Sequence, residues 1–226
     1  MHRMATVLCA IVAGMALWGG GVRADPPPFC NGLDCPAFSN VSAGDGVELR
    51  SYDPAFWVHT NVNESDVNKA KGKGLTRLDR YFFGYNDGDH YIPATAPIVT
   101  EMKTNATSYE FFYFIPFEYQ ESPPVPSSPD VFVDDLPAAN FYVSTFGGYA
   151  EPELVALEAQ TLLSKLKATG ATVDECRYYV AEYDSPFQTT DRHNEIWYRD
   201  VAAPAPAPQP SPAPGTATAA TVVTVV

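Results

Sequence analysis

The sequence has few positively charged residues. Its 226 residues include 14 lysines and arginines against 27 aspartates and glutamates, which gives a formal net charge of −13 at pH 7. A surface this acidic repels phosphate backbones at long range. The main basic cluster lies within residues 69–80 and consists of Lys69, Lys71, Lys73, Arg77 and Arg80. We therefore expect no nucleic-acid partner.

The sequence also lacks the short motifs that mark common catalytic sites. It contains no Gly-x-Ser-x-Gly turn, no His-Glu-x-x-His pair, no phosphate-binding loop and no Gly-x-Gly-x-x-Gly between a strand and a helix. The adjacent acids Asp134 and Asp135 are interpreted as a turn. We expect a non-catalytic protein, and an enzyme whose catalytic residues are distant in sequence is the alternative.

Cysteine is scarce as well. Cys9 lies in the predicted leader described below, which leaves Cys30, Cys35 and Cys176 in the mature chain. An odd number of cysteines in an oxidising compartment leaves one unpaired. The closeness of Cys30 and Cys35 favours a disulfide between them, with a free Cys176 buried at the start of a strand. A bridge from Cys176 to either of the other two is the alternative, and a zinc site is not expected.

The N-terminus is typical of a secretory signal peptide. Arg3 precedes an apolar run over residues 5–18, and the tripeptide at 22–24, Val-Arg-Ala, suits a signal-peptidase site. The run is shorter than the about 20 residues that cross a bilayer, so we expect cleavage after Ala24 and no membrane span. Secretion would expose three Asn-x-Ser/Thr glycosylation sequons, at Asn40, Asn63 and Asn105.

Composition divides the rest of the chain into three parts. Residues 25–44 are an N-terminal extension that holds the close cysteine pair, and residues 45–200 carry the hydrophobic patterns of one domain. Residues 201–226 are rich in Ala, Pro, Thr and Val and have no charged side chain. This composition predicts a disordered, partly polyproline tail that acts as a linker or stalk. We expect a monomer.

A strand–helix–strand–strand pattern occurs twice in the domain. In the first copy, strands are predicted at 55–62, 96–102 and 109–115, with a helix at 66–83. The proline-rich residues 122–129 connect this copy to the second.

The second copy has the clearer helix. Strands are predicted at 139–146, 177–183 and 195–199. Between the first two, a helix starts near Pro152 and ends at Gly170. Its apolar stripe is Val155, Ala159, Leu162 and Leu166. Neither copy can bury its apolar faces alone, so the sequence predicts an α+β domain in which the copies form a distorted antiparallel β-barrel with two packed helices.

Seven segments of the domain resemble, in the right order, the signatures of the SOUL heme-binding protein family: residues 48–58, 95–100, 114–116, 122–126, 146–149, 181–186 and 194–197. The resemblance runs from about residue 45 to residue 199. It implies duplicated strand–helix–strand–strand units around a distorted barrel, in agreement with the repeat. It also implies reversible, non-covalent binding of heme or another tetrapyrrole and no established reaction.

The resemblance places the ligand against the first helix and the loop between the last two strands. The implied heme-binding residues are Leu75, Arg77, Leu78, Arg80, Phe82, Phe187, Arg192 and His193. Apolar walls suit a flat porphyrin, and arginines suit its carboxylates. Some family members have a histidine, proposed as an iron ligand, directly before the tyrosine of the first segment. Ser51 occupies that position here.

Candidate iron ligands are few. His59, His90 and His193 are the imidazoles outside the leader, and His193 ranks first because it lies in the loop that the resemblance implies. Each is nevertheless better interpreted as a surface or packing residue. The tyrosines considered as phenolate ligands are interpreted as core residues: Tyr85, Tyr183 and Tyr198.

Two functions of other classes stay open at this point. The fold can serve as an extracellular structural or protein-interaction module with the tail as a spacer. It can also carry another small hydrophobic ligand in place of a tetrapyrrole.

Overall fold

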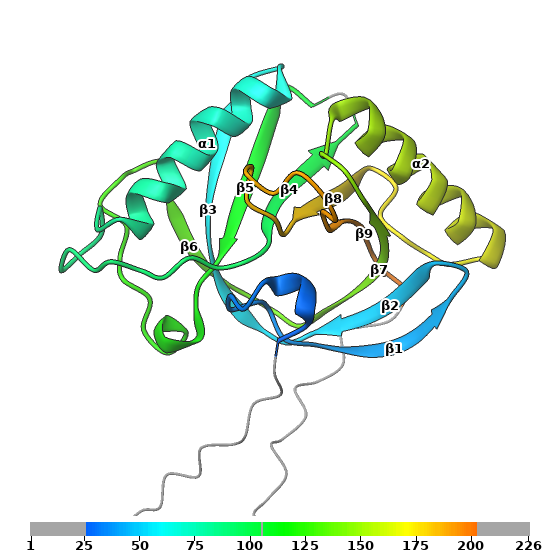
Figure 1. Cartoon of the computed structure of the whole chain (residues 1–226), viewed down its shortest axis with the longest axis horizontal. Helices are drawn as coiled ribbons and strands as arrows, with labels where there is room; N and C mark the ends of the chain where they lie inside the picture. Colours follow the sequence, from blue (N-terminus) through cyan, green and yellow to red (C-terminus); the bar gives the residue numbers. More distant parts are fainter. Residues whose placement is uncertain (1–25, 105, 203–226) are drawn as a thin grey trace, which may run out of the picture.

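The computed structural model describes residues 26–104 and 106–202. The predicted signal peptide, Asn105 and all but two residues of the predicted tail lie outside this part of the chain. Within it, one nine-stranded antiparallel sheet is accompanied by two α-helices (Figure 1). The elements are η1 Pro28–Cys30, β1 Phe38–Gly44, β2 Val47–Tyr52, β3 Ala55–Asn63, α1 Val67–Phe82, β4 Ile98–Lys103, β5 Ser108–Phe114, η2 Phe117–Tyr119, β6 Phe132–Leu136, β7 Ala139–Phe146, α2 Pro152–Thr169, β8 Arg177–Glu182 and β9 Asn194–Arg199.

The duplicated pattern predicted from the sequence is confirmed. The first copy is β3, α1, β4 and β5, and the second is β7, α2, β8 and β9. The strand order is β1-β2-β7-β9-β8-β4-β5-β3-β6. Strand β4 of the first copy pairs with β8 of the second, so the two copies share one continuous sheet.

The sheet curls until one of its faces becomes an interior. Inner-face residues from most of the strands join a single hydrophobic cluster that includes Tyr52 of β2 and Trp57 of β3. These two strands are far apart in the strand order, so only a curled sheet brings both side chains into one cluster. The result is the predicted distorted barrel, open between the edge strands β1 and β6.

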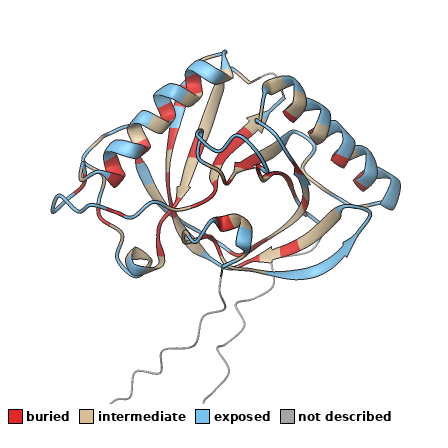
Figure 2. Cartoon of the chain, viewed as in Figure 1, coloured by how far each residue is buried: buried red, intermediate tan, exposed pale blue. Residues whose placement is uncertain are grey.

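The two helices cover the outer face, each over its own hydrophobic cluster (Figures 1 and 2). Helix α1 packs Leu78 and Phe82 onto β3 and β5, and α2 packs Val155 and Leu162 onto β8 and β9. In both helices the buried residues form one stripe and the opposite side is exposed, as expected for helices that cover a sheet. No helix in residues 26–104 and 106–202 has the length and apolar character that a bilayer span requires.

The ends of both helices follow local sequence signals. The carboxylate of Asp66 caps α1 by accepting hydrogen bonds from the backbone N–H groups of Asn68 and Lys69. Pro152 is the first residue of α2, where a missing N–H costs nothing. Gly170 ends α2 with a φ of 74°, a left-handed conformation that favours glycine.

Three strands complete the sheet outside the predicted copies. Strand β1 lies in the segment predicted as an N-terminal extension, and it pairs with β2. The interpretation of Asp134 and Asp135 as a turn is wrong, because both residues pair with β3 as part of β6. Strands β1 and β6 form the two edges and are mostly exposed, and β2 places the charged Arg50 in the interior. None of the three therefore has the apolar alternation that marks a half-buried strand.

The predicted Cys30–Cys35 disulfide is present, and its segment packs into the inner cluster. Cys176 is free, as expected, but its predicted burial is wrong. It lies exposed in the turn before β8, where its backbone N–H donates to the carboxylate of Asp174. The sequon asparagines Asn40 and Asn63 are both exposed.

Two glycines provide a matched test of how α1 packs. A Cβ at Gly74 would overlap the ring of Phe111 on β5, whereas a Cβ at Gly72 meets nothing within 4 Å. We expect Gly74→Ala to lower the free energy of unfolding by about 1–3 kcal/mol through overpacking. Gly72→Ala should raise it by about 0.5–1 kcal/mol through helix propensity. Urea unfolding measures both, and an unchanged midpoint for Gly74→Ala would contradict this packing.

Candidate functional site

A cavity of about 200 Å³ opens into the interior of the half-barrel. Aromatic rings form most of its wall: Tyr52, Trp57, Phe112, Phe141, Tyr179 and Trp197. Its two charged lining residues, Asp53 and Arg199, are exposed. Leu136, the last residue of β6, and Pro137, in the connection to β7, close one side. The site thus has an apolar wall and charged groups on its solvent side.

Strand alternation directs these rings inward. Trp197 of β9 lies opposite Tyr179 of β8, and Arg199, two residues further on, lies opposite Phe141 of β7. Residues two apart on a strand share a face, so Arg199 follows Trp197 along the cavity. Neighbouring rings are in contact, with centroids 5.0 Å apart for Tyr52 and Trp197 and 5.8 Å apart for Phe141 and Tyr179.

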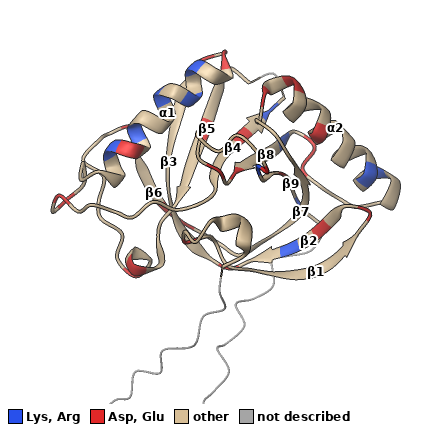
Figure 3. Cartoon of the chain, in the orientation of Figure 1, with Lys and Arg blue, Asp and Glu red and all other residues tan. Residues whose placement is uncertain are grey.

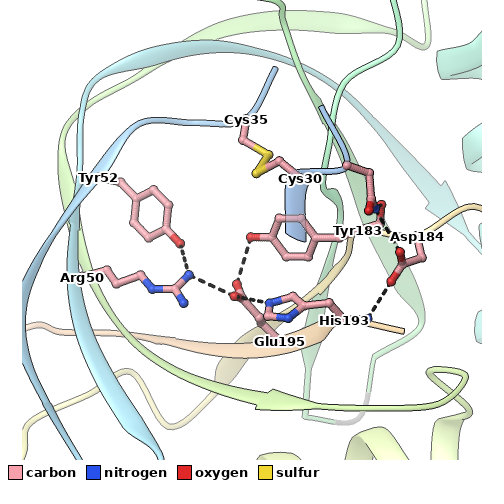
Figure 4. The surroundings of a disulfide bond; sticks show 9 residues. Cys30, Cys35, Arg50, Tyr52, Tyr183, Asp184, His193 and Glu195 are labelled. Atoms are coloured by element: carbon pink, nitrogen blue, oxygen red, sulfur yellow. Dashed lines mark hydrogen bonds and ion pairs between the residues drawn. A yellow bond between two sulfur atoms is a disulfide. The ribbon is translucent and has the colours of Figure 1, made fainter. Parts of the chain in front are cut away.

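A buried carboxylate, that of Glu195 on β9, lies behind the cavity wall (Figure 4). It is bonded to Arg50 Nη1 at 3.0 Å, His193 Nε2 at 2.8 Å, Tyr183 Oη at 2.9 Å and Trp197 Nε1 at 2.7 Å. We call these five residues the polar centre. Burial alone would raise the pKa of Glu195, but the bond from His193 and the charge of Arg50 outweigh it and lower this pKa. The carboxylate is therefore ionised at neutral pH.

The polar centre also orients two rings of the cavity wall. The indole N–H of Trp197 donates to Glu195, and the hydroxyl of Tyr52 accepts a hydrogen bond from Arg50 at 3.2 Å. Burial raises the pKa of Tyr52, so its phenol stays neutral. Satisfied buried networks of this kind hold side chains in one arrangement, and the cavity is thereby preformed.

The N-terminal segment closes the interior beside the polar centre. Phe29 of η1 stacks on the ring of His193, with centroids 4.3 Å apart and an interplanar angle of 3°. The guanidinium of Arg50 lies 5.6 Å from the centre of the Phe29 ring. The Cys30–Cys35 disulfide ties this segment into a compact loop (Figure 4). Part of the segment predicted as an extension, from Phe29 to Cys35, thus packs into the domain interior, whereas β1 of the same segment is mostly exposed.

The helix residues of the predicted site have mixed surroundings. Leu78 and Phe82 are buried between α1 and the sheet, and Leu75 is half-buried beside them. They stabilise the helix and offer little surface to a ligand. Arg80 is exposed, and its guanidinium lies 4.4 Å from the ring centre of Tyr85.

Two basic side chains of α1, those of Arg77 and Lys71, form ion pairs with different parts of the sheet. Lysine and arginine positions are spread along α1 (Figure 3). Arg77 pairs with Asp130, just before β6, at 3.2 Å. Lys71 extends in the other direction and pairs with Glu182 at the end of β8, at 2.5 Å. Arg77 is therefore paired near β6, whereas the pair of Lys71 lies at the end of β8, which leads into the last loop.

Arg192 holds the last loop closed. Its guanidinium donates to the carbonyl groups of Asp184 at 3.2 Å, Ser185 at 2.7 Å and Gln188 at 2.8 Å. Its Nη1 and Nη2 atoms are therefore engaged by its own loop, whereas its buried Nε has no hydrogen-bond partner among the described residues. Phe187, in the same loop, is 92% exposed and is the predicted loop residue with a free surface.

The cavity wall contains no histidine. His193 is bonded to Glu195, and His59 is bonded through both ring nitrogens, to Glu110 at 2.7 Å and to Asp134 at 2.9 Å. In the part of the chain that the structure describes, no group of three or more His, Cys, Asp or Glu side chains is arranged to hold a metal ion. Tyr183 and Tyr198 are buried core residues, as predicted, whereas Tyr85 is 44% exposed.

Sequence reasoning missed the cavity, although its rings follow a recognisable pattern. Phe141, Tyr179 and Trp197 occupy inward positions of β7, β8 and β9, and none of them was predicted as a site residue. The pattern that marks them is the presence of large aromatic residues on the same face of neighbouring strands. That pattern becomes visible only when the strand order and register are known.

A curled antiparallel sheet with two outer helices and an aromatic inner cavity defines the class of domain, and comparison with known proteins gives its family. The model of the family described as SOUL heme-binding protein matches residues 33–199. The chain belongs to this family, which confirms the resemblance.

Relatives agree with this assignment, and a solved structure has a similar fold. Heme-binding protein 2 of Mus musculus is 34% identical over 155 residues, which cover 66% of this chain and 76% of that protein. Heme-binding protein 1 of Xenopus tropicalis is 30% identical over 167 residues, covering 70% and 87%. The crystal structure of the EcmrR C-terminal domain superposes with a TM-score of 0.53 at 12% identity, covering 68% of this chain and 95% of that one. That similarity concerns the fold alone.

His59 should make the attachment of β6 depend on pH. Burial lowers the pKa of His59, but the hydrogen bonds and charges of Glu110 and Asp134 outweigh it and raise this pKa above 6.5. The two ion pairs of protonated His59 therefore contribute their full stabilisation below pH 6.5, and this contribution is lost as the pH rises through the raised pKa. We expect the free energy of unfolding to fall across this window. Urea unfolding at several pH values measures the slope, and the same slope in His59→Gln would assign it to another group.

Two glutamates allow a matched test of the polar centre. Glu195→Gln leaves the buried charge of Arg50 without its counter-ion, and we expect the free energy of unfolding to fall by about 3–5 kcal/mol. Glu182→Gln removes a partly exposed pair with Lys71 and should cost less than about 1 kcal/mol. Chemical denaturation compares the two variants. Equal losses would show that the polar centre contributes no more than a surface ion pair.

Proposed function

We propose that this chain is a secreted, non-catalytic protein that binds heme or a related tetrapyrrole reversibly in the inner cavity. The observation that carries the proposal is the preformed aromatic wall with Arg199 on its solvent side. A flat apolar ring that bears carboxylates needs these two features, an apolar wall and a cation near its edge. Membership in the SOUL heme-binding protein family supports the ligand class.

The size of the cavity limits how such a ligand enters. Its volume of about 200 Å³ lies below the roughly 300–1,000 Å³ of pockets that enclose a drug-sized molecule. One edge of a tetrapyrrole therefore enters between the rings, and the remainder lies over the mouth. Arg199 makes no ion pair or side-chain hydrogen bond within residues 26–104 and 106–202, so its guanidinium is available for a propionate.

The lining residues can contact the porphyrin ring, but they include no suitable ligand for its iron. No imidazole lines the cavity. Burial raises the pKa of the lining phenols of Tyr52 and Tyr179, so neither is a phenolate at neutral pH. Bound heme would supply its iron and its absorbance, while this chain would supply apolar contacts and a cation. We therefore infer that binding does not depend on the metal.

Secretion is part of the proposal. The leader-like residues 1–24, the exposed sequons at Asn40 and Asn63, and the Cys30–Cys35 disulfide all suit an extracellular protein. The site implied by the family resemblance, on α1 and the last loop, is the competing location for the ligand. It would use Arg77, Arg80 and the exposed Phe187. A carrier of another hydrophobic ligand and a scaffold for protein interaction are the competing functions.

Arg199 and the α1 arginines distinguish the two locations. We expect hemin and a metal-free porphyrin to bind the chain lacking residues 1–24 with similar micromolar or tighter affinity. Arg199→Glu should weaken both about 10- to 100-fold, the equivalent of one lost charge-assisted hydrogen bond. The double variant Arg77→Glu, Arg80→Glu should change neither. Absorbance titration follows hemin, and quenching of Trp57 and Trp197, which both line the cavity, follows either ligand.

The opposite pattern would overturn the location, because loss of binding in the α1 double variant alone places the ligand on α1. Absence of saturable binding of either ligand would instead favour the scaffold function. Unfolding midpoints of each variant, measured in parallel, separate a binding defect from a folding defect.

A further inference from the structure

We propose that the proline-alanine segment of residues 203–214, in this same chain, docks on the mouth of the aromatic cavity and competes with its ligand. The inference rests on the cavity of the proposed function but not on the identity of the ligand. It assigns a specific occupant to the open side of the cavity.

The first argument is where the described chain ends. Arg199 lines the cavity, and Ala202 is the last described residue, three positions further on. The path between them is fixed by two backbone hydrogen bonds, from the N–H of Asp200 to Asn140 and from the N–H of Val201 to Thr172. Three residues of extended chain span at most about 11 Å, so Ala202 lies no further than that from the backbone of Arg199.

The second argument is the chemistry of the segment. Residues 203–214 carry no charge and contain six prolines: Pro204, Pro206, Pro208, Pro210, Pro212 and Pro214. Proline-rich segments favour the polyproline II conformation, which binds aromatic-lined grooves with little loss of entropy. The cavity wall is aromatic and already includes Pro36 and Pro137. The uncharged, proline-rich segment is therefore chemically complementary to the aromatic cavity wall.

Size and polarity agree with this occupant. A dry apolar cavity of about 150 Å³ holds a benzene molecule, so the about 200 Å³ here has room for a proline ring or two. Polyproline II has no internal hydrogen bonds and leaves its carbonyl groups free to accept. The guanidinium of Arg199 can donate to such a carbonyl, and an uncharged segment meets no repulsion from Asp53.

The tether makes even weak docking effective. Twelve residues of polyproline II span roughly 37 Å, which lets the segment turn back across the mouth. A segment on a short tether has an effective concentration on the order of 1 mM. A docking dissociation constant of about 0.2 mM would then lower the apparent affinity of the cavity ligand roughly fivefold.

The experiment uses the full chain without residues 1–24 and a variant of equal length in which the six prolines are replaced by serine: Pro204→Ser, Pro206→Ser, Pro208→Ser, Pro210→Ser, Pro212→Ser and Pro214→Ser. Removal of residues 1–24 takes Trp18 away, and the two remaining tryptophans, Trp57 and Trp197, line the cavity, so their fluorescence reports on its mouth without any ligand. We expect the variant to show red-shifted emission, stronger quenching by acrylamide and roughly fivefold tighter hemin binding.

A synthetic peptide of residues 203–214 provides the second measurement. Added to the serine variant, it should restore the emission and the protection from acrylamide with a submillimolar dissociation constant, and the six-serine peptide should not. Unchanged tryptophan emission and quenching in the variant would overturn the proposal. Emission that depends on protein concentration would also overturn it, by assigning the occupant to a second copy. Because these readouts need no tetrapyrrole, they stand even if the chain binds none.

Discussion

The ion pair between Arg50 and Glu195 is the interaction on which the interior depends. Its partners come from β2 and β9, which are separated in the sheet by β7, so the pair crosses the curled face. Burying two charges costs several kcal/mol per ion unless hydrogen bonds also satisfy the donors and acceptors that the ion pair itself leaves unpaired. Tyr183, His193 and Trp197 provide those bonds to the carboxylate. The polar centre therefore has to form as a unit or not at all.

This requirement divides the inner face into two regions with different roles. On one side of the polar centre, Phe29 and the disulfide segment fill the interior by stacking on His193. On the other side, Tyr52 and Trp197 turn their rings toward the cavity while their polar atoms stay bonded to the centre. The outer face needs no such arrangement, because two amphipathic helices cover it with ordinary apolar packing.

The sequence predicted the parts of the fold that have a strong period. In both helices the apolar residues recur at the spacing of one buried stripe, as Leu162 and Leu166 do in α2. In the six strands of the repeated units apolar and polar residues tend to alternate. The edge strands β1 and β6 bury little, and two acids occupy the middle of β6, so hydrophobic pattern could not mark them. Arg50 in β2 was the hardest residue to place from the sequence. Its burial depends on the counter-ion Glu195, which lies 145 positions further along the chain.

The functional site was less predictable for a related reason. Composition and family resemblance indicated the class of ligand, but the residues implied for it depend on which way α1 turns. Arg77 faces Asp130 and Lys71 faces Glu182. The spacing of these residues along the helix does not reveal the two directions, because they depend on how the helix lies on the sheet. The cavity rings share a face only through the register of β7, β8 and β9.

The construction of the cavity also explains how a wall of fixed shape can accept a ligand larger than about 200 Å³. The rings of Tyr52 and Trp197 are fixed by the polar centre, whereas Leu136 ends the edge strand β6 and Pro137 begins the connection after it. Edge strands and connections open locally at lower free energy than central strands. In the proposed complex, a flat ligand that needs more room would be accommodated on the β6 side, where opening leaves Glu195 and its partners undisturbed. The rings fixed by the polar centre would then hold the thin edge of the large ring while the β6 side opens.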